Sequence, residues 1–169
     1  MYREPWLCGV CSTAGDIEAL RVGAFTRQCF GHTDEVLDVA FSPCGRNVAS
    51  VSKDGTLRLW ESPTVFQTAK YSPHGGKPIS SVRWAVTNNR LCTFGKDNTV
   101  CILDPSNGVQ LASWIMHTAV TSLAVSPACD RVAVGDETGS VRLLRLRLPD
   151  GEADPPAVGT IVKVFSAEK

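Results

Sequence analysis

Short apolar segments alternate with polar turns along most of this chain. One run, "VLDVAFSP", begins at Val36, and comparable runs begin at Ile79 and Val120. A second apolar segment follows each run after about ten residues, and a third comes directly after a tight polar turn. The segments are rich in Val, Leu, Ile and Thr, as β-strands are, and none has the helical period of about 3.6 residues. The pattern therefore predicts an all-β fold.

The predicted strands recur with a fixed period. The three histidines, at positions 32, 74 and 117, are spaced by 42 and 43 residues. Equivalent positions in the third strands are spaced by 43 and 41 residues, and they are Trp60, Leu103 and Leu144. Fourth strands are expected at 64–71, 109–116 and 160–167. Four antiparallel strands in each period of 41 to 43 residues are typical of the blades of a β-propeller.

Two tight turns separate the second and third strands of the first two repeats. They read Lys53-Asp54-Gly55 and Lys96-Asp97-Asn98. Glycine and asparagine tolerate the positive φ that such hairpin turns require, so both turns fit this place in the pattern.

The segment from Gly31 to Ser62, "GHTDEVLDVAFSPCGRNVASVSKDGTLRLWES", resembles a repeat of the WD-repeat family. It has the Gly-His opening, the Phe-Ser-Pro strand end, the serine-rich second strand, the Asp-Gly turn and the Leu-Trp ending. The second repeat departs from the pattern with Leu103 in place of the tryptophan. The third has Thr138 in place of the turn aspartate and Leu144 in place of the tryptophan.

The resemblance implies a WD-type β-propeller of about three four-stranded antiparallel blades, at 31–73, 74–116 and 117–169, the last with a loop at about 149–158. Residues 1–30 are expected to form a partial, degraded blade. Since propellers close with about four to eight blades, we expect an incomplete ring, an open arc. Three explanations stay open: a fragment or short isoform of a larger multi-repeat protein, which we favour, pairing with further blades or a second copy, or a stand-alone arc.

In WD-repeats, the residues that match the motif form a hydrogen-bonded chain within the blade. The resemblance assigns this role to Trp60, to Ser50 or Ser52, to His32 and to Asp54. A hydroxyl can accept from an indole N–H and bond onward to an imidazole, which can bond a carboxylate. Such a chain joins separate strands and fixes their register. We therefore predict a structural role for this set.

His32, Ser50 and Asp54 also have the composition of a catalytic triad. We disfavour that interpretation, because the histidines recur with the repeat and the serine is inside a strand, without the strained turn that presents a nucleophile. Three histidines on separate blades cannot meet at one metal ion. The sequence also has no glycine-rich phosphate loop and no dense cluster of His or Asp. We expect no enzyme activity, no cofactor and no metal.

The expected function is that of a non-catalytic scaffold for protein–protein interaction. In this family the residue before the turn aspartate tends to lie on the top face, which here gives Lys53, Lys96 and Glu137, with Glu35 nearby. Lys53 and Lys96 on adjacent blades are candidates for a basic patch that binds an acidic or phosphorylated segment. The alternative is that both are simply solvated turn lysines. A component of a ribonucleoprotein assembly is the second candidate function, and a propeller enzyme is the third.

Composition narrows the choice of partners. Seventeen basic residues balance seventeen acidic ones, and this net charge of +0 disfavours a nucleic-acid ligand. No apolar run approaches the roughly 18 residues of a membrane span, and we identify no secretory signal. The seven cysteines are an odd number at irregular spacing. We therefore expect reduced thiols and a cytoplasmic protein, with the nucleus and the cytoskeleton as alternatives.

Cys8 and Cys11, in "WLCGVC", have the spacing of a redox dithiol or of half a zinc clamp. In an extended strand, however, the Cα atoms of residues three apart lie about 10 Å from each other and their side chains point to opposite faces. Two such thiols can neither form a disulfide nor share a metal ion. We predict that both are small apolar residues of the degraded blade.

Overall fold

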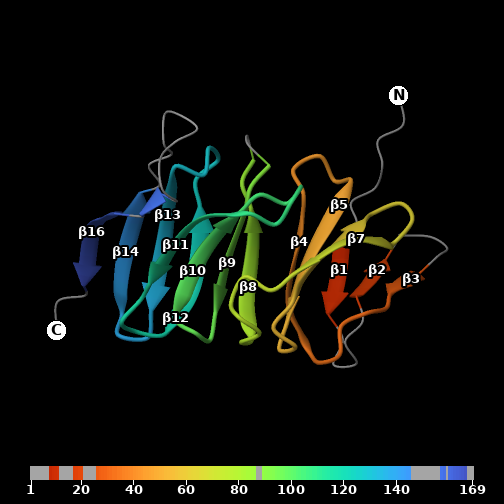
Figure 1. Cartoon of the computed structure of the whole chain (residues 1–169), viewed down its shortest axis with the longest axis horizontal. Helices are drawn as coiled ribbons and strands as arrows, with labels where there is room; N and C mark the ends of the chain where they lie inside the picture. The colour runs from red at the N-terminus through yellow and green to blue at the C-terminus, as the bar shows by residue number, and fades with distance from the viewer. Residues whose placement is uncertain are drawn as a thin grey trace.

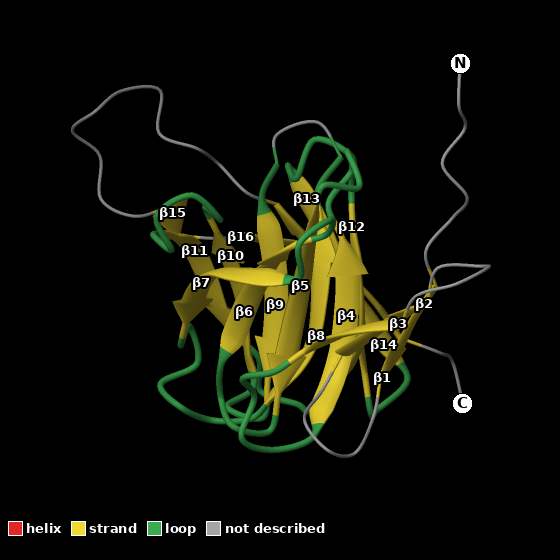
Figure 2. Cartoon of the chain, turned by 90° about the vertical axis from the view of Figure 1, so that its right-hand side faces the viewer, coloured by secondary structure: helices red, strands yellow, loops and turns green. Residues whose placement is uncertain are grey.

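The computed structural model describes residues 8–11, 17–20, 26–86, 89–145, 157–158 and 160–166, with side chains within 27–86 and 89–145. These residues form β-strands, turns and loops, and the strands are grouped in four sheets (Figure 2). The predicted all-β class is confirmed. No helix in the described part of the chain is long and apolar enough to cross a membrane.

Three of the sheets follow the predicted repeat. Sheet 1 holds β4 (Val36–Phe41), β5 (Asn47–Ser52), β6 (Leu57–Glu61) and β7 (Phe66–Tyr71). Sheet 2 holds β8 (Ile79–Trp84), β9 (Leu91–Gly95), β10 (Thr99–Leu103), β11 (Gln110–Ile115) and an added strand, β15 (Ala157–Val158). Sheet 3 holds β12 (Val120–Val125), β13 (Arg131–Asp136), β14 (Ser140–Arg145) and β16 (Thr160–Ser166). In each sheet the four repeat strands are antiparallel neighbours in chain order.

The N-terminal sheet has three described strands, β1 (Cys8–Cys11), β2 (Ile17–Leu20) and β3 (Thr26–Cys29). They occupy the places that the sequence predicts for the second, third and fourth strands of a blade. Cys8 and Cys11 are the two ends of β1, so their backbone is extended. Their side chains lie outside the described part of the structure. The division of the chain at residues 31, 74 and 117 stays a prediction.

The predicted loop at about 149–158 is wrong at its end. Ala157 and Val158 form β15, which pairs in parallel with Ala112 and Ser113 of β11. The outer strand of a sheet has unpaired backbone groups along its free edge, so a passing extended segment can bond to it. The other residues of that loop lie outside the described residues.

The sheets stand side by side with the first described strand of each next to that of its neighbour. Strand β4 contacts β8, β8 contacts β12, and β1 contacts β4. Figure 1 shows the resulting row, from β16 and sheet 3 at one end to the N-terminal sheet at the other. Position within a sheet decides the burial pattern: the central strand β9 is buried at all five positions, whereas the outer strand β7 alternates between exposed and half-buried residues. Strand β9 is buried on both faces because sheet 1 packs on one side of sheet 2 and sheet 3 on the other.

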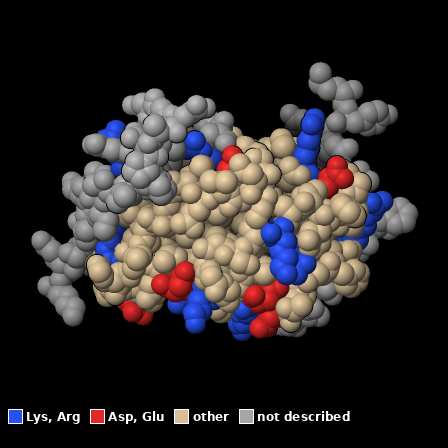
Figure 3. Space-filling view, viewed as in Figure 1, with Lys and Arg blue, Asp and Glu red and all other residues tan. Residues whose placement is uncertain are grey.

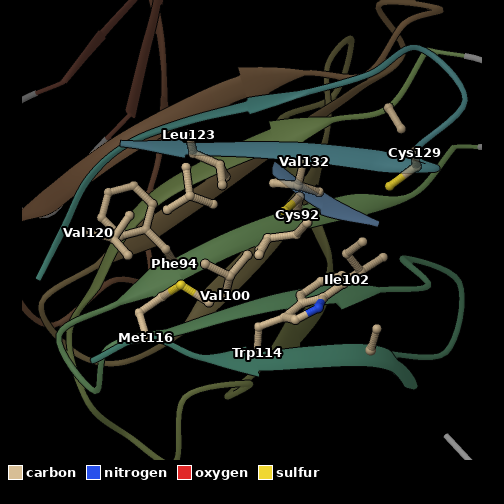
Figure 4. Packing of buried hydrophobic residues seen from close by; sticks show 14 residues of the cluster. Cys92, Phe94, Val100, Ile102, Trp114, Met116, Val120, Leu123, Cys129 and Val132 are labelled. Carbon is tan, nitrogen blue, oxygen red and sulfur yellow. The ribbon is translucent and has the colours of Figure 1, made fainter. Parts of the chain in front are cut away.

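The hydrophobic core lies between neighbouring sheets. The cluster between sheets 2 and 3 includes Cys92, Phe94, Ile102, Trp114, Leu123, Val132, Val134 and Leu144 (Figure 4). The cluster between sheets 1 and 2 consists of Ala49, Val51, Leu57, Leu59, Ile79, Val82, Leu91 and Leu103. A smaller cluster, Cys29, Val36, Val48 and Trp60, joins β3 to sheet 1. Each sheet therefore depends on its neighbours to remove its apolar faces from water.

Polar contacts also join sheets 1 and 2. The carboxylate of Asp38 in β4 accepts a hydrogen bond from the Ser81 hydroxyl at 2.5 Å and from the backbone N–H of Val82 at 3.1 Å. It also forms an ion pair with Arg83. The indole N–H of Trp84 donates to the backbone carbonyl of Ala40 at 3.0 Å. These bonds satisfy polar groups where the first strands of the two sheets meet.

The predicted turn chemistry is present in both turns. Gly55 has a φ of +76° and Asn98 a φ of +60°. Gly55 is also constrained by space, because a Cβ atom there would lie 2.4 Å from the backbone carbonyl of Gly76 in the loop that leads into sheet 2. The glycine thus allows both the turn and a close approach between two repeats.

Candidate functional site

Sheet 1 contains a buried chain of three hydrogen bonds that links two strands and a loop. The indole N–H of Trp60 in β6 donates to the Ser50 hydroxyl in β5 at 2.8 Å. Nε2 of His32, in the loop before β4, lies 2.7 Å from the same hydroxyl. Nδ1 of His32 lies 2.9 Å from Oδ2 of Asp54 in the β5–β6 turn. The structure thus brings together four of the five residues of the predicted set.

The partners of His32 determine the direction of these bonds. Burial lowers the pKa of His32, although the neighbouring Asp54 acts in the opposite direction, so the imidazole is neutral near pH 7. Burial acts to raise the pKa of Asp54, but hydrogen bonds from Thr56, His32 and the backbone hold it well below its usual value. The carboxylate of Asp54 therefore accepts a hydrogen bond from the Nδ1–H of His32. Nε2 of His32 accepts a hydrogen bond from the Ser50 hydroxyl.

Ser52, the other serine of the predicted set, has a different role. Its hydroxyl donates to the backbone carbonyl of Asp34 at 3.0 Å and accepts the backbone N–H of Asp54 at 3.1 Å. It therefore ties the turn to the loop before β4 and is not part of the chain through His32. Ser50 and Ser52 share a face of β5, but Trp60 pairs with Val48, so Ser50 is the nearer of the two serines and Ser52 lies two residues further along, next to the turn.

A second set in sheet 2 repeats this arrangement with threonine in place of serine. Nε2 of His74 lies 3.0 Å from the Thr93 hydroxyl, and Nδ1 lies 2.9 Å from Oδ1 of Asp97. Thr99 adds a hydroxyl 2.8 Å from the same Nδ1. Our sequence analysis missed Thr93 and Thr99. The signal for Thr99 was present, since threonine follows the turn aspartate by two residues in both repeats, a spacing at which an Asp side chain bonds the backbone.

In sheet 3, different residues form the hydrogen bonds at the equivalent place. His117 is exposed, because two residues separate it from β12, whereas three separate His32 from β4. Asp136, whose side chain is fully buried, replaces the turn aspartate. Its Oδ2 atom accepts the Thr118 hydroxyl and pairs with Arg142, both at 2.8 Å. Its Oδ1 atom accepts the backbone N–H of Thr138 at 2.9 Å. Hydrogen bonds from the Thr138 hydroxyl, from Thr118 and from the backbone lower the pKa of Asp136, although burial acts in the opposite direction.

The order Ser50–His32–Asp54 matches a catalytic triad in connectivity, but its accessibility does not fit one. Ser50 is 0% exposed, and none of the His32 side chain is exposed. The Ser50 hydroxyl already donates to His32 and accepts from Trp60, so no substrate atom can approach it. Within the described residues, no group of three or more His, Cys, Asp or Glu side chains is placed to hold a metal ion.

The predicted top-face residues lie at one end of the sheets in equivalent places. In each sheet, the residue before the turn donates its backbone N–H to the residue before the first strand. Lys53 donates to Glu35 at 2.9 Å, Lys96 to Pro78 at 2.8 Å, and Glu137 to Ala119 at 3.1 Å. We call the surface formed by these three pairs the turn face. It is the lower edge of the molecule in Figure 1.

The charge of the turn face is mixed. The Lys53 ammonium forms an ion pair with Glu35, and this hydrogen bond raises the pKa of Lys53. Lys96 and Lys77 are exposed and make no ion pair with a residue in the described ranges. Glu137 is exposed on sheet 3. Figure 3 accordingly shows both blue and red side chains along this edge. Lys77 precedes Pro78, whose carbonyl accepts the backbone N–H of Lys96, so these two lysines belong to the same part of the turn face.

Comparison with known proteins identifies the repeat. The family described as "WD domain, G-beta repeat" matches residues 23–61, 66–104 and 108–144. A pre-rRNA-processing protein of Scheffersomyces stipitis is 27% identical over 86% of this chain and 31% of its own length. Subunit I of eukaryotic translation initiation factor 3 of Pyricularia oryzae is 29% identical over 78% of this chain and 40% of its own length. The chain therefore spans less than half of the length of these curated relatives.

The fold also matches a solved structure. A chain in the crystal structure of the mitotic checkpoint complex superposes with a TM-score of 0.81 and 18% sequence identity. The match covers 99% of this chain and 52% of that one. The arrangement of the four sheets is therefore that of about half of a longer β-protein.

Proposed function

Because the chain belongs to the WD-repeat family, we propose that it is a non-catalytic scaffold that binds other proteins or peptide segments through its loops. The buried polar sets support this proposal, since their hydroxyl, imidazole and carboxylate groups bond one another and hold strands and turns together. A catalytic site would need such groups exposed to a substrate.

The turn face is the observation that carries the proposal. It places equivalent loops of three sheets next to one another on a rigid framework, with exposed side chains of different charge. An acidic or phosphorylated segment would bind near the turns of sheets 1 and 2, where Lys77 and Lys96 are exposed and Lys53 is close to Glu35. Charge-assisted hydrogen bonds from ammonium groups to carboxylate or phosphate are stronger than neutral ones.

The test is to reverse the charge of the two unpaired lysines with Lys77→Glu plus Lys96→Glu. Lys53→Glu is less informative, because it also breaks the ion pair with Glu35. Partner proteins would be recovered by affinity purification and quantified by mass spectrometry. We expect recovery to fall by about tenfold, which corresponds to about 1.4 kcal/mol of binding free energy.

The matched control is Arg46→Glu, an exposed residue in the β4–β5 turn at the opposite end of sheet 1. It should leave recovery unchanged. Equal recovery of partner proteins with the double variant and with the wild type would show that these two lysines are solvated turn residues that do not contribute to binding. Recovery no better than that of a tag-only control would refute the scaffold function itself.

An RNA-associated assembly is the second candidate, favoured by the name of one relative as a pre-rRNA-processing protein. The net charge of +0 gives no support to direct binding of RNA. Retention on immobilised RNA that falls steeply with salt would favour this candidate, because phosphate contacts release counterions. Retention that does not depend on salt would count against it.

The proposed location is the cytoplasm, where thiols stay reduced. Five cysteines within the described residues are free, and four of these are buried. Burial raises the pKa of Cys29, Cys101 and Cys129 to about 11, so these thiols are poorly reactive. Cell fractionation tests the location, and recovery in a secreted fraction would contradict it.

A further inference from the structure

The charges of the turn face change sign from one sheet to the next. At sheet 1, Asp34 and Glu35 are adjacent in the loop before β4, and Lys53 forms an ion pair with Glu35. Asp34 is exposed, and its Oδ1 atom accepts the backbone N–H of Glu35 at 2.7 Å. Lys70 is exposed too, but it lies on β7, the strand of sheet 1 farthest from β4. Two carboxylates therefore accompany one ammonium group at this turn, which makes it acidic.

The turn of sheet 2 is basic. Lys77 and Lys96 are both exposed, and neither forms an ion pair with a described residue. The carboxylate of Asp97, next to Lys96 in the sequence, is bonded within sheet 2. It accepts the Thr99 hydroxyl at 2.7 Å and the Thr99 backbone N–H at 3.0 Å, and Nδ1 of His74 lies 2.9 Å from it. This turn therefore presents two ammonium groups to a partner.

The turn of sheet 3 is acidic again. Glu137 is exposed in the turn between β13 and β14. Arg142 of the same sheet is paired with the buried Asp136 at 2.8 Å, so its charge does not offset that of Glu137. From sheet 1 to sheet 3, the exposed charges therefore run negative, positive, negative. Figure 3 shows basic side chains between acidic ones along the lower edge.

One extended segment can reach all three turns. Strand β4 contacts β8, and β8 contacts β12, so the three sheets are direct neighbours. Packed sheets lie about 10 Å apart, and an extended chain advances about 3.3 Å for each residue. Side chains about three residues apart in such a segment would therefore meet successive turns of the turn face.

We propose that the turn face binds an extended segment in which a phosphorylated residue has Lys or Arg about three residues away on both sides. The phosphate group carries a charge of about −1.5 to −2 at neutral pH, which matches the two ammonium groups of Lys77 and Lys96. The basic residues on either side meet Asp34 and Glu35 at sheet 1 and Glu137 at sheet 3. Acidic residues at those positions would place like charges opposite each other, which is costly.

This inference rests on the proposed scaffold function and adds the charge order of the partner. Because both flanks of the phosphate are basic, the segment fits the turn face in either chain direction. The two flanking contacts are exposed ion pairs, so they determine which segment binds more than how tightly it binds.

The test is selection from a synthetic peptide library with a fixed central phosphoserine and randomised flanking positions. The immobilised wild-type chain would retain peptides, and mass spectrometry would identify them. We expect Lys and Arg on both sides of the phosphoserine to be enriched about two- to fivefold. Replacing the phosphoserine by serine should lower retention about tenfold, because the charge-assisted bonds are lost. Lys77→Glu plus Lys96→Glu should remove this preference for phosphoserine.

A charge reversal at sheet 3 tests the flanks. Glu137→Lys should lower the enrichment of basic residues, on one flank if the segment binds in one direction and on both flanks if it binds in either. The matched control is Glu61→Lys, an exposed acidic residue at the opposite end of sheet 1, where it pairs with Asn47. It should leave the selection unchanged.

Three results would overturn the proposal. Acidic flanks in the retained peptides, or the same selection by Glu137→Lys and the wild type, would contradict the charge order. Equal retention of the serine and phosphoserine libraries would contradict the phosphorylated centre. Equal retention with a central glutamate would assign the turn face to acidic segments instead. None of these results refutes the scaffold function, which fails only if partner recovery falls to that of the tag-only control.

Discussion

Trp60 donates its indole N–H to the hydroxyl of Ser50 over 2.8 Å, and the two residues are 2% and 0% exposed. The buried Trp114 in sheet 2 has no acceptor for its indole N–H in the described part of the structure. Trp114 is 5% exposed, so both tryptophans are buried, and the hydrogen bond to a side-chain acceptor is present at Trp60 but not at Trp114. The comparison isolates the contribution of the polar chain from that of aromatic burial.

We expect Trp60→Phe to lower the free energy of unfolding by about 2–4 kcal/mol, because it leaves a cavity and removes one partner of Ser50. Trp114→Phe also leaves a cavity but breaks no hydrogen bond in the described structure. Its cost should be smaller by about 1–2 kcal/mol. Urea denaturation followed by circular dichroism measures both. Equal losses would show that the hydrogen bond contributes nothing.

The close approach of Gly55 to Gly76 predicts an unusually sensitive glycine. Gly55→Ala introduces a Cβ atom 2.4 Å from the Gly76 carbonyl, in addition to the cost of a positive φ. We expect a loss of about 2–5 kcal/mol in the free energy of unfolding. Gly45→Ala is the control, because Gly45 has a similar φ of +70° with nothing within 4 Å of the added atom. It should cost only about 1–2 kcal/mol.

The free energy of unfolding should fall in two steps as the pH is lowered. Burial lowers the pKa of His32 and His74 from 6.5, so only the unfolded chain takes up these protons as the pH first drops below 6.5. Each histidine then removes up to about 1.4 kcal/mol per pH unit, until the pH reaches its folded pKa. A second loss is expected below pH 3.8, because hydrogen bonds lower the pKa of Asp54 and Asp97 despite their burial.

Urea midpoints between pH 7 and 5 measure the first step. His74→Gln should reduce the slope of stability against pH, because one buried histidine no longer titrates. His32→Gln should reduce the slope in the same way. A wild-type stability that is flat over this range would contradict the assignment of neutral, buried histidines.

The carboxylate of sheet 3 predicts a contrast between two aspartates. Asp136→Asn should lower the melting temperature, because Arg142, whose side chain is only 17% exposed, loses its counter-charge and the turn loses a strong acceptor. Asp130→Asn is the control, since Asp130 is exposed and its partners among the described residues, Ser126 and Arg131, are near it in the sequence. Thermal unfolding would compare them. A larger effect at Asp130 would contradict the role given to Asp136.

The sequence by itself determined the strands, the period and the family. Apolar segments at fixed spacing can bury their faces only as stacked sheets, and the Asp-Gly and Asp-Asn turns require residues that accept a positive φ. Trp60, Ser50, His32 and Asp54 could be named because the motif keeps them at fixed distances along the chain.

Only the tertiary structure decided how each repeat satisfies its buried polar groups. Asp136 takes over from the missing turn aspartate, and His117 points to solvent, because loops of different length change which residue reaches the interior. The structure likewise determined that the Ser50 hydroxyl is buried away from solvent and that Lys53 is paired with Glu35, whereas Lys96 has no such partner among the described residues. Burial and pairing depend on neighbours far apart in the sequence, and a one-dimensional pattern does not contain those contacts.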